Sequence, residues 1–283
     1  MIDETKEPNP LPYDMGNAGD LIKHGLLAEY TAWWTRNKQG KFIFYDPFGG
    51  RPYVSPPNQI VTARISSLNG CALNKAQNDS EKYYGSGHIV KNIASVLNGE
   101  CEIYTSDRDD NAYQALIASG LMKINIAKFD RTNAYTILDC NFTKMEPSLI
   151  LIDPFAEFLR DDAKRIIPKI TNFIRNHKIP VLLFVLNLEP SNRVGKAYSE
   201  LINNHFQDLC EIALICPKLK NTGVKGESKY ISEARLIYPP KLFTEKELFS
   251  FKEQVVKFKT LLEAALNRDA NIIALVETSS CKT

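Results

Sequence analysis

The stretch "FIFYDPFGG", residues 42–50, combines the end of a strand with the turn that follows it. Four apolar or aromatic residues lead into Asp46, and the two glycines after Phe48 favour a tight turn. A second stretch, "LILIDPF" at 149–155, repeats the same order of residue types. Each stretch therefore predicts a buried strand that ends in an acidic residue.

Including the strands of these two stretches, the chain contains seven strand-like apolar runs. They lie at 42–46, 101–106, 123–129, 148–153, 180–187, 211–216 and 234–238. Helix-length segments separate most of them, which is typical of a parallel α/β sheet with helices on both faces. The link at 217–233 has no apolar helix pattern, so the last two strands are expected to be antiparallel neighbours.

Helical patterns are clearest near the two ends of the chain. After a candidate N-cap at Asn17, the residues Ile22, Leu26, Tyr30 and Trp33 recur at spacings of three and four. Near the other end, a helix at about 244–266 begins with a Thr244/Glu247 capping box.

The domain organisation follows from the spacing of these elements. Residues 1–15 are acidic and rich in proline, and we expect a loose arm there. Residues 16–283 then form one domain, with a small helical insertion at about 52–98, because the first two strands are too far apart for a simple connection. Seven strands with only the last pair lacking a helical crossover are typical of the class I methyltransferase sheet, which is Rossmann-like.

Composition restricts the class of protein. Among 283 residues, 44% are hydrophobic and the net charge is only +2, so any nucleic-acid surface must be local. The six cysteines form no CxxC pair, which predicts mostly reduced thiols and no metal site. The sequence contains no signal peptide and no apolar run long enough for a membrane, so we expect a cytoplasmic protein.

Acidic residues follow four successive strands. Asp46 and Asp153 end the first and fourth runs, Asp107 follows the second, and Asp130 follows the third. Ligands of open α/β sheets bind at the carboxyl ends of the strands, where Asp107 would suit ribose hydroxyls and Asp130 an adenine amino group. Gly49 would allow a close backbone approach to such a ligand. The alternative is that these turns only terminate strands.

The fourth strand carries the motif with the clearest chemistry. The Asp153 carboxylate and the Pro154 carbonyl can both accept hydrogens from an amine, which would turn the nitrogen lone pair toward a methyl donor. The ring of Phe155 could stack a base that has left its helix. A plain turn at the end of a buried strand is the alternative.

Several motifs carry a family resemblance. "GNAGDLIKH" at 16–24 closely resembles the G-N-x-x-D-x-x-K-H signature of the RlmJ family, bacterial 23S ribosomal RNA adenine-N6 methyltransferases. "KYYGSG" at 82–87 is similar to the family's R-Y-Y-P-G-S-P, "LILIDPF" to L-I-L-I-D-P-P-Y, and "LIYPP" at 236–240 to V-I-N-P-P. The motifs occur in family order and span nearly the whole chain from Gly16. The related three-Cys-motif partner proteins share the same opening.

This resemblance implies adenine-N6 methylation of nucleic acid, RNA more than DNA, with S-adenosylmethionine as the cofactor. It implies that Lys23 and Ser86 contact the methionine end of the cofactor, that Asp107 holds the ribose and that Asp130 faces the adenine. Asp46, Phe48 and Gly49 belong to the cofactor loop, and Asp153, Pro154 and Phe155 to catalysis.

Two departures from the family leave other functions open. The chain has Asp-Pro-Phe-Ala where the family has Asp-Pro-Pro-Tyr, and Phe48 replaces a cofactor-contacting His. One alternative is therefore a module that binds the cofactor or a nucleotide within a larger complex, such as a defence complex, with a protein partner. Another is a methyltransferase for a protein or small-molecule amine.

A lysine-rich segment at 217–230 is the candidate surface for phosphates. Lys218, Lys220, Lys225 and Lys229 stand there against one acidic residue, Glu227. A solvated loop without a ligand is the alternative.

Overall fold

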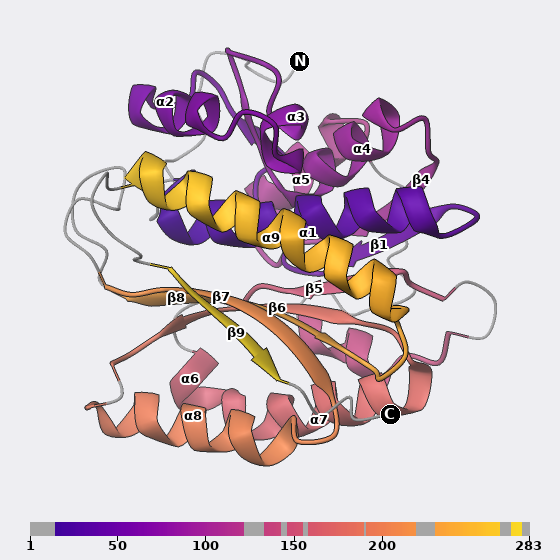
Figure 1. Ribbon diagram of the computed structural model, residues 1–283, viewed down its shortest axis with the longest axis vertical. Coiled ribbons are helices and arrows are strands. Elements are labelled where there is room, and N and C mark those ends of the chain that lie inside the picture. The colour runs from indigo at the N-terminus through magenta and orange to yellow at the C-terminus, as the bar shows by residue number, and fades with distance from the viewer. Residues whose placement is uncertain are drawn as a thin grey trace.

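The computed structural model describes residues 15–121, 133–142, 146–154, 158–189, 191–218, 230–266 and 273–278. Within these ranges the chain forms one mixed sheet with helices on both faces (Figure 1). Its seven strands are β1 (Phe42–Asp46), β4 (Cys101–Thr105), β5 (Leu149–Ile152), β6 (Val181–Asn187), β7 (Cys210–Cys216), β8 (Ile231–Tyr238) and β9 (Ala274–Thr278). The α/β fold with a seven-stranded sheet is confirmed.

The order of strands across the sheet is β4-β1-β5-β6-β8-β7-β9. The first four are parallel, whereas β8 runs antiparallel to both of its neighbours. Tyr45 of β1 pairs with Tyr104 of β4 and with Ile150 of β5, so the carboxyl ends of these three strands lie side by side. The predicted antiparallel pairing of the last two runs is also confirmed, with Cys210 opposite Tyr238.

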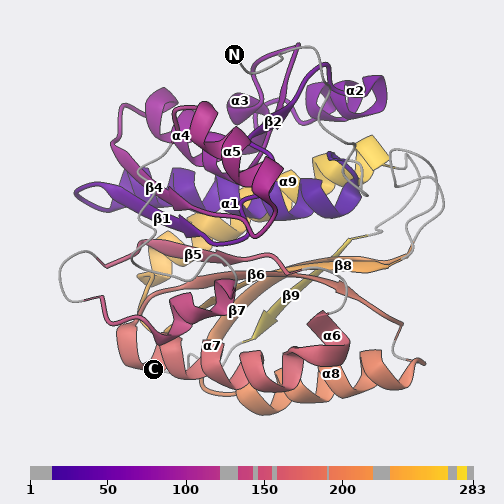
Figure 2. The ribbon, with the colours of Figure 1, turned by 180° about the vertical axis from the view of Figure 1, so that it is seen from behind.

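Helices cover the two faces of the sheet (Figure 2). One face packs against α1 (Ala18–Asn37), α4 (Ser86–Val96) and α9 (Glu245–Leu266), and the other against α7 (Ala163–His177) and α8 (Arg193–His205). Strand β5 consists only of leucine and isoleucine and is buried throughout, as expected for a parallel strand covered on both sides.

The N-terminal helix α1 is buried along the whole of 18–33 and not only on its predicted stripe. A Cβ at Gly25 would lie 1.9 Å from the ring of Phe258, and a Cβ at Gly19 would lie 2.7 Å from the hydroxyl of Ser232. These glycines let α9 and β8 approach the helix closely. Asn17 caps α1 as predicted, since its side chain accepts the N–H of Asp20 at 3.0 Å.

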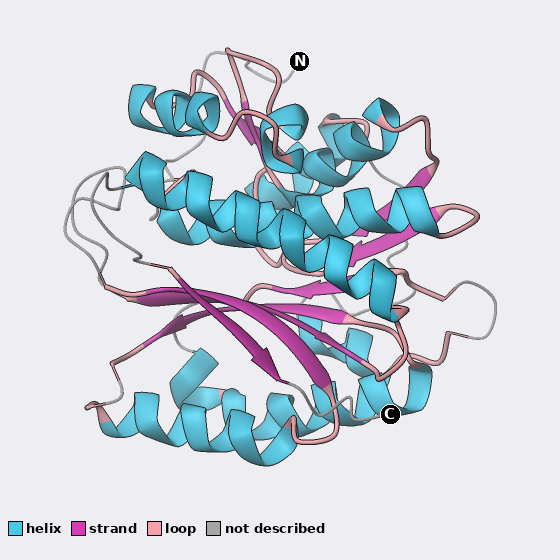
Figure 3. Ribbon diagram, viewed as in Figure 1, coloured by secondary structure: helices cyan, strands magenta, loops and turns pink. Residues whose placement is uncertain are grey.

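Between β1 and α4 the chain forms a small insertion that packs on the same hydrophobic core as α1 and α9. Strand β2 (Tyr53–Val54) pairs antiparallel with β3 (Tyr83–Tyr84), and α2 (Gln59–Ser67) and α3 (Ala72–Ala76) lie between them in sequence. Figure 3 shows this short pair of strands among the helices at the top of the molecule. The following helix, α4, packs against α1, β1 and β4 and forms the crossover to β4.

Some elements differ from the sequence-based expectation. The predicted strand at 123–129 lies outside the described residues. Strand β9 was not predicted, although residues 272–276 form an apolar run. It is short and partly exposed, and it pairs with β7. The remaining helices are α5 (Asp110–Ala118), the 3-10 helix η1 (Ala134–Asp139) and α6 (Phe158–Asp161). The capping box is confirmed, with Thr244 and Glu247 bonded reciprocally.

The cysteines are not all reduced. Cys210 is disulfide-bonded, whereas Cys71, Cys101, Cys140 and Cys216 are not. Among the described residues, no group of three or more His, Cys, Asp or Glu side chains is arranged to hold a metal ion. No helix in the described ranges is both long enough and apolar enough to cross a membrane.

Candidate functional site

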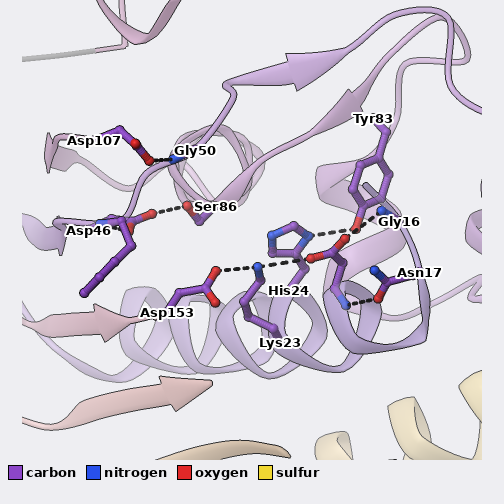
Figure 4. Close-up of polar contacts among 12 residues, drawn as sticks. Gly16, Asn17, Lys23, His24, Asp46, Gly50, Tyr83, Ser86, Asp107 and Asp153 are labelled. Atoms are coloured by element: carbon purple, nitrogen blue, oxygen red, sulfur yellow. Dashed lines mark hydrogen bonds and ion pairs between the residues drawn. The ribbon is translucent and has the colours of Figure 1, made fainter. Parts of the chain in front are cut away.

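Three predicted carboxylates meet at one edge of the sheet. Asp46 is the last residue of β1, Asp153 follows β5 directly, and Asp107 lies two residues beyond β4. Because β4, β1 and β5 are adjacent and parallel, these side chains gather at their shared carboxyl ends, where open α/β sheets bind ligands. Figure 4 shows them together with residues from the first two turns of α1 and the first turn of α4.

Lys23 joins α1 to this edge. Its Nζ lies 2.6 Å from Oδ2 of Asp153 and 3.1 Å from Oδ1 of Asp20, and the side chain is buried. Asp20 is held in turn, because its other oxygen accepts the N–H of Gly16 at 2.9 Å. The ammonium also lies 5.0 Å from the ring centroid of Phe184, a favourable cation–π distance. The first turn of α1 therefore fixes Lys23 against the carboxylate that follows β5.

Asp46 is the most deeply buried of these carboxylates, with 1% of its surface exposed. It accepts a short hydrogen bond from the hydroxyl of Ser86, the first residue of α4, and a second from the N–H of Phe48 at 3.1 Å. Burial raises the pKa of Asp46 to about 7, and the hydrogen bond from Ser86 only partly offsets this. Asp46 therefore titrates near neutrality.

Asp107 fixes the turn after β1. Its two oxygens accept the N–H groups of Gly50 at 2.9 Å and of Asp109 at 2.8 Å, and burial raises its pKa. A Cβ at Gly49 would lie 2.0 Å from Oγ1 of Thr105, so this glycine is needed for packing against the end of β4. The expected reason for Gly49 was close approach to a ligand. The structure gives contact with β4 as a sufficient reason.

The cluster sets the four carboxyl groups of Asp20, Asp46, Asp107 and Asp153 against the one ammonium of Lys23, and Asp46 is the member that titrates near neutrality. Burial raises the pKa of Asp153, whereas the adjacent ammonium of Lys23 lowers it. His24, the neighbour of Lys23, adds no charge, because burial holds its pKa well below the usual range, and its Nδ1 hydrogen-bonds the hydroxyl of Tyr83 at 2.7 Å. Arg108 is exposed, and its positive charge offsets part of the negative charge of Asp107. The cluster thus favours a cationic ligand.

The other predicted site residues are less closely connected. Pro154 is buried beside Asp153, and Phe48 is half-buried with its ring centroid 5.3 Å from that of Tyr135. Asp130 and Phe155 lie outside the described residues.

Of the lysine-rich segment, the structure describes only Lys218, and Lys220, Lys225 and Lys229 lie outside it. Lys218 is exposed and lines a pocket of about 340 Å³ with Asn187, Glu189 and Asn192 at the end of β6. Since β6 neighbours β5, this lysine belongs to the same edge of the sheet as Asp153.

Two supporting residues of the site were not predicted from the sequence. Asp20 lies within the quoted motif at 16–24 but was assigned no role, although its i,i+3 spacing to Lys23 signals an ion pair. Tyr83 belongs to a quoted motif, but its bond to His24 joins residues 59 positions apart, which no local pattern reveals.

Taken together, the strand order and the edge of the sheet that carries the carboxylates define a Rossmann-like α/β protein with the class I methyltransferase topology. No protein-family model matches the chain, and a search of curated proteins finds no match.

Solved structures do match. Protein LPL1258 from Legionella pneumophila, described under the family name DUF519, is similar with a TM-score of 0.63 and 16% identity, over 93% of this chain and 97% of that chain. A probable spermidine synthase from Corynebacterium glutamicum matches with a TM-score of 0.42 and 10% identity, over 87% of this chain and 79% of that chain. At 16% identity, the likeness to LPL1258 shows a shared fold and does not extend to a shared reaction.

Proposed function

We propose that this protein is an S-adenosylmethionine-dependent methyltransferase that acts on the N6 amino group of adenine in nucleic acid. The observation that carries the proposal is the convergence of Lys23, Asp46, Ser86, Asp107 and Asp153 at the carboxyl ends of β4, β1 and β5. The resemblance to the RlmJ family assigned roles to these same residues. The resemblance rests on sequence motifs alone, so the proximity of these residues in the structure is an independent observation.

The chemistry of these residues fits the cofactor. S-adenosylmethionine carries a sulfonium, an ammonium and a carboxylate, with a ribose and an adenine. The acidic cluster suits the two cationic groups, and Lys23 suits the carboxylate. The plane of the Asp107 carboxylate is fixed by two backbone N–H groups at the strand end where this topology binds a ribose.

The cofactor, when bound, supplies an electrophilic methyl group. The chain's own part is to orient the acceptor amine. Lys23 holds Oδ2 of Asp153 at 2.6 Å and stabilises its ionised form, and the carboxylate keeps acceptor capacity for an amine hydrogen. The Pro154 carbonyl is the second proposed acceptor. Two such acceptors turn the nitrogen lone pair toward the methyl group, so positioning provides most of the rate.

One observation favours a second candidate, a module that binds the cofactor without transferring the methyl group. The same contact between Lys23 and Asp153 occupies the carboxylate that should receive the amine. If that ion pair persists in the complex, the site binds the cofactor and the acceptor amine is not oriented.

Two measurements test the proposal. Isothermal titration calorimetry should show S-adenosylmethionine binding that Asp107→Ala abolishes, because the variant loses both the ribose ligand and the anchor of the Gly50 turn. Asp139→Ala is the matched control, since that carboxylate is exposed on η1 and bonded to Lys169. Transfer of a tritiated methyl group to total RNA or DNA should require Asp153, with Asp153→Asn as the variant.

The outcomes separate the two candidates. Binding of S-adenosylmethionine without transfer to RNA, DNA or protein supports the binding module. Label that enters only protein overturns the nucleic-acid acceptor. If the wild-type chain does not bind S-adenosylmethionine, both candidates fail.

A further inference from the structure

The β2–β3 pair is anchored at both of its ends to the candidate site. Before β2, the N–H of Gly50 bonds Asp107, and after β3, the hydroxyl of Ser86 bonds Asp46. The N–H of Gly85 also donates to the carbonyl of Pro52 at 2.9 Å, which closes the pair at its base. Tyr53 lies three residues after Gly50, so their Cα atoms are within about 11 Å of each other. The pair therefore stands at the rim of the site.

An exposed aromatic ring is presented by this pair. Tyr53 keeps 39% of its surface exposed. The Nζ of Lys82 lies 4.9 Å from the centroid of its ring, and the ring of His88 lies 6.1 Å away in an edge-on arrangement. A cation and a second ring thus restrict the tyrosine ring without burying it. It is a preformed stacking surface with a positive charge beside it.

The strand behind Tyr53 is held rigidly. The side chain of Gln77 bonds the backbone N–H of Tyr84 at 2.7 Å and its carbonyl at 2.9 Å. The hydroxyl of Tyr84 donates to Asp79 at 2.9 Å, and its ring stacks on that of His88 at 5.1 Å. Little conformational entropy is therefore lost when a ligand settles on Tyr53.

Charge is concentrated in the same segment. Residues 51–98 contain five basic and two acidic side chains, a net charge of +3, whereas the whole chain carries only +2. One of the acidic residues, Asp79, already accepts hydrogen bonds from Tyr84 and from the N–H of Glu81. The basic residues are Arg51, Arg64, Lys75, Lys82 and Lys91. The rest of the molecule is net negative, so a polyanion would be drawn to this unit.

A pocket adjoins this surface. It measures about 320 Å³ and lies between α2 and α3, with Val61, Ile65 and Tyr83 among its apolar lining. Lys75 and Lys82 also line it, and Lys82 is the residue that covers Tyr53. Asp79 and several uncharged polar side chains line it as well. The exposed ring, the lysines and a recess of mixed polarity therefore follow one another along one surface.

We propose that Tyr53, Lys82, Lys75 and this pocket bind a single-stranded segment of the acceptor nucleic acid. One base stacks on Tyr53, the lysines contact the phosphates, and an adjacent base enters the pocket. Single strands are favoured over a duplex, because stacking on a side chain requires an unpaired base with an open face. The inference rests on the proposed function, since it gives the acceptor a second contact outside the site of methyl transfer.

Binding of a short, labelled, adenine-rich single strand, measured by fluorescence anisotropy in the absence of cofactor, tests the inference. RNA and DNA versions of the same sequence are compared. Tyr53→Ala should weaken binding at least fivefold, a typical loss for one stacked base, whereas Tyr53→Phe keeps the ring and should bind like the wild type. Lys82→Gln should weaken binding and reduce the slope of log affinity against log salt by about 0.7. Matched controls are Phe249→Ala on α9, where the ring is 65% exposed, and Lys196→Gln on α8.

Several results would overturn the inference. They are a wild-type chain that binds no single strand, a Tyr53→Ala loss no larger than that of Phe249→Ala, and equal competition by duplex or by polyglutamate. Methyl transfer to nucleic acid with an unchanged KM in Tyr53→Ala would overturn it and leave the proposed function standing. Single-strand binding that depends on Tyr53, without any methyl transfer, would uphold the surface and overturn the proposed function.

Discussion

Asp46 offers the sharpest test of the electrostatics of the site. It is a buried carboxylate whose pKa is raised to about 7 by loss of solvation. Replacement by asparagine removes the titration and keeps the shape. The amide oxygen can accept the N–H of Phe48, and the amide N–H can donate to the hydroxyl of Ser86.

The sign and size of the effect follow from linkage. Between the ordinary pKa of 3.8 and about 7, native Asp46 keeps a proton that the unfolded chain has released. The free energy of unfolding therefore falls as the pH rises through this range, by about 1.4 kcal/mol per unit, or about 4 kcal/mol in total. Between pH 5 and pH 7 the share of Asp46 is about 3 kcal/mol. Asp46→Asn should remove this share, so the free energy of unfolding of the variant should rise relative to that of the wild type as the pH rises.

Urea unfolding at pH 5 and pH 8 measures the effect. Trp33 is fully buried in α1, so tryptophan fluorescence reports on unfolding. The loss of unfolding free energy between the two pH values should be about 3 kcal/mol larger in the wild type than in Asp46→Asn.

Asp208→Asn is the control. Arg175 lowers the pKa of Asp208, so that exposed carboxylate titrates below pH 5 in both states. This variant should run parallel to the wild type between pH 5 and pH 8. If Asp46→Asn also runs parallel, burial does not perturb Asp46, and the account of the acidic cluster is wrong.

Two further substitutions test packing and the central ion pair. Gly25→Ala should lower the free energy of unfolding by about 1–3 kcal/mol, because its Cβ meets Phe258. Gly87→Ala is the comparison, because its Cβ makes only ordinary contacts at 3.5 Å and the change should be neutral or stabilising. Urea unfolding measures both variants. Lys23→Met should cost about 3 kcal/mol at pH 8 and less at pH 5, because burial raises the pKa of Asp153 and its protonation then replaces the lost cation. An equal loss at both pH values would show that Lys23 contributes packing alone.

Much of this fold could be predicted from local patterns. The apolar runs at β1, β4, β5 and β6, the cap at Asn17 and the Thr244/Glu247 box are all local features, and local physics decides them. Strand β9 was missed, although the apolar run at 272–276 overlaps it. Its five residues are held by hydrogen bonds to β7, a partner about sixty residues away in the sequence, and contribute little burial of their own.

The candidate site also combines local features that the sequence predicts with tertiary features that it does not. The sequence by itself determined which residue types end these strands, because the Asp-Pro turns at Asp46 and Asp153 and the Ser-Asp pair after the second run are local, and so Asp46, Asp107 and Asp153 were identifiable. Only the tertiary structure decided that Lys23 pairs with Asp153 across 130 positions and that Asp46 loses its solvent. Charge interactions and desolvation depend on distance and burial in three dimensions. These are set by the order of the strands and the helices that cover them, and no short stretch of the chain contains them.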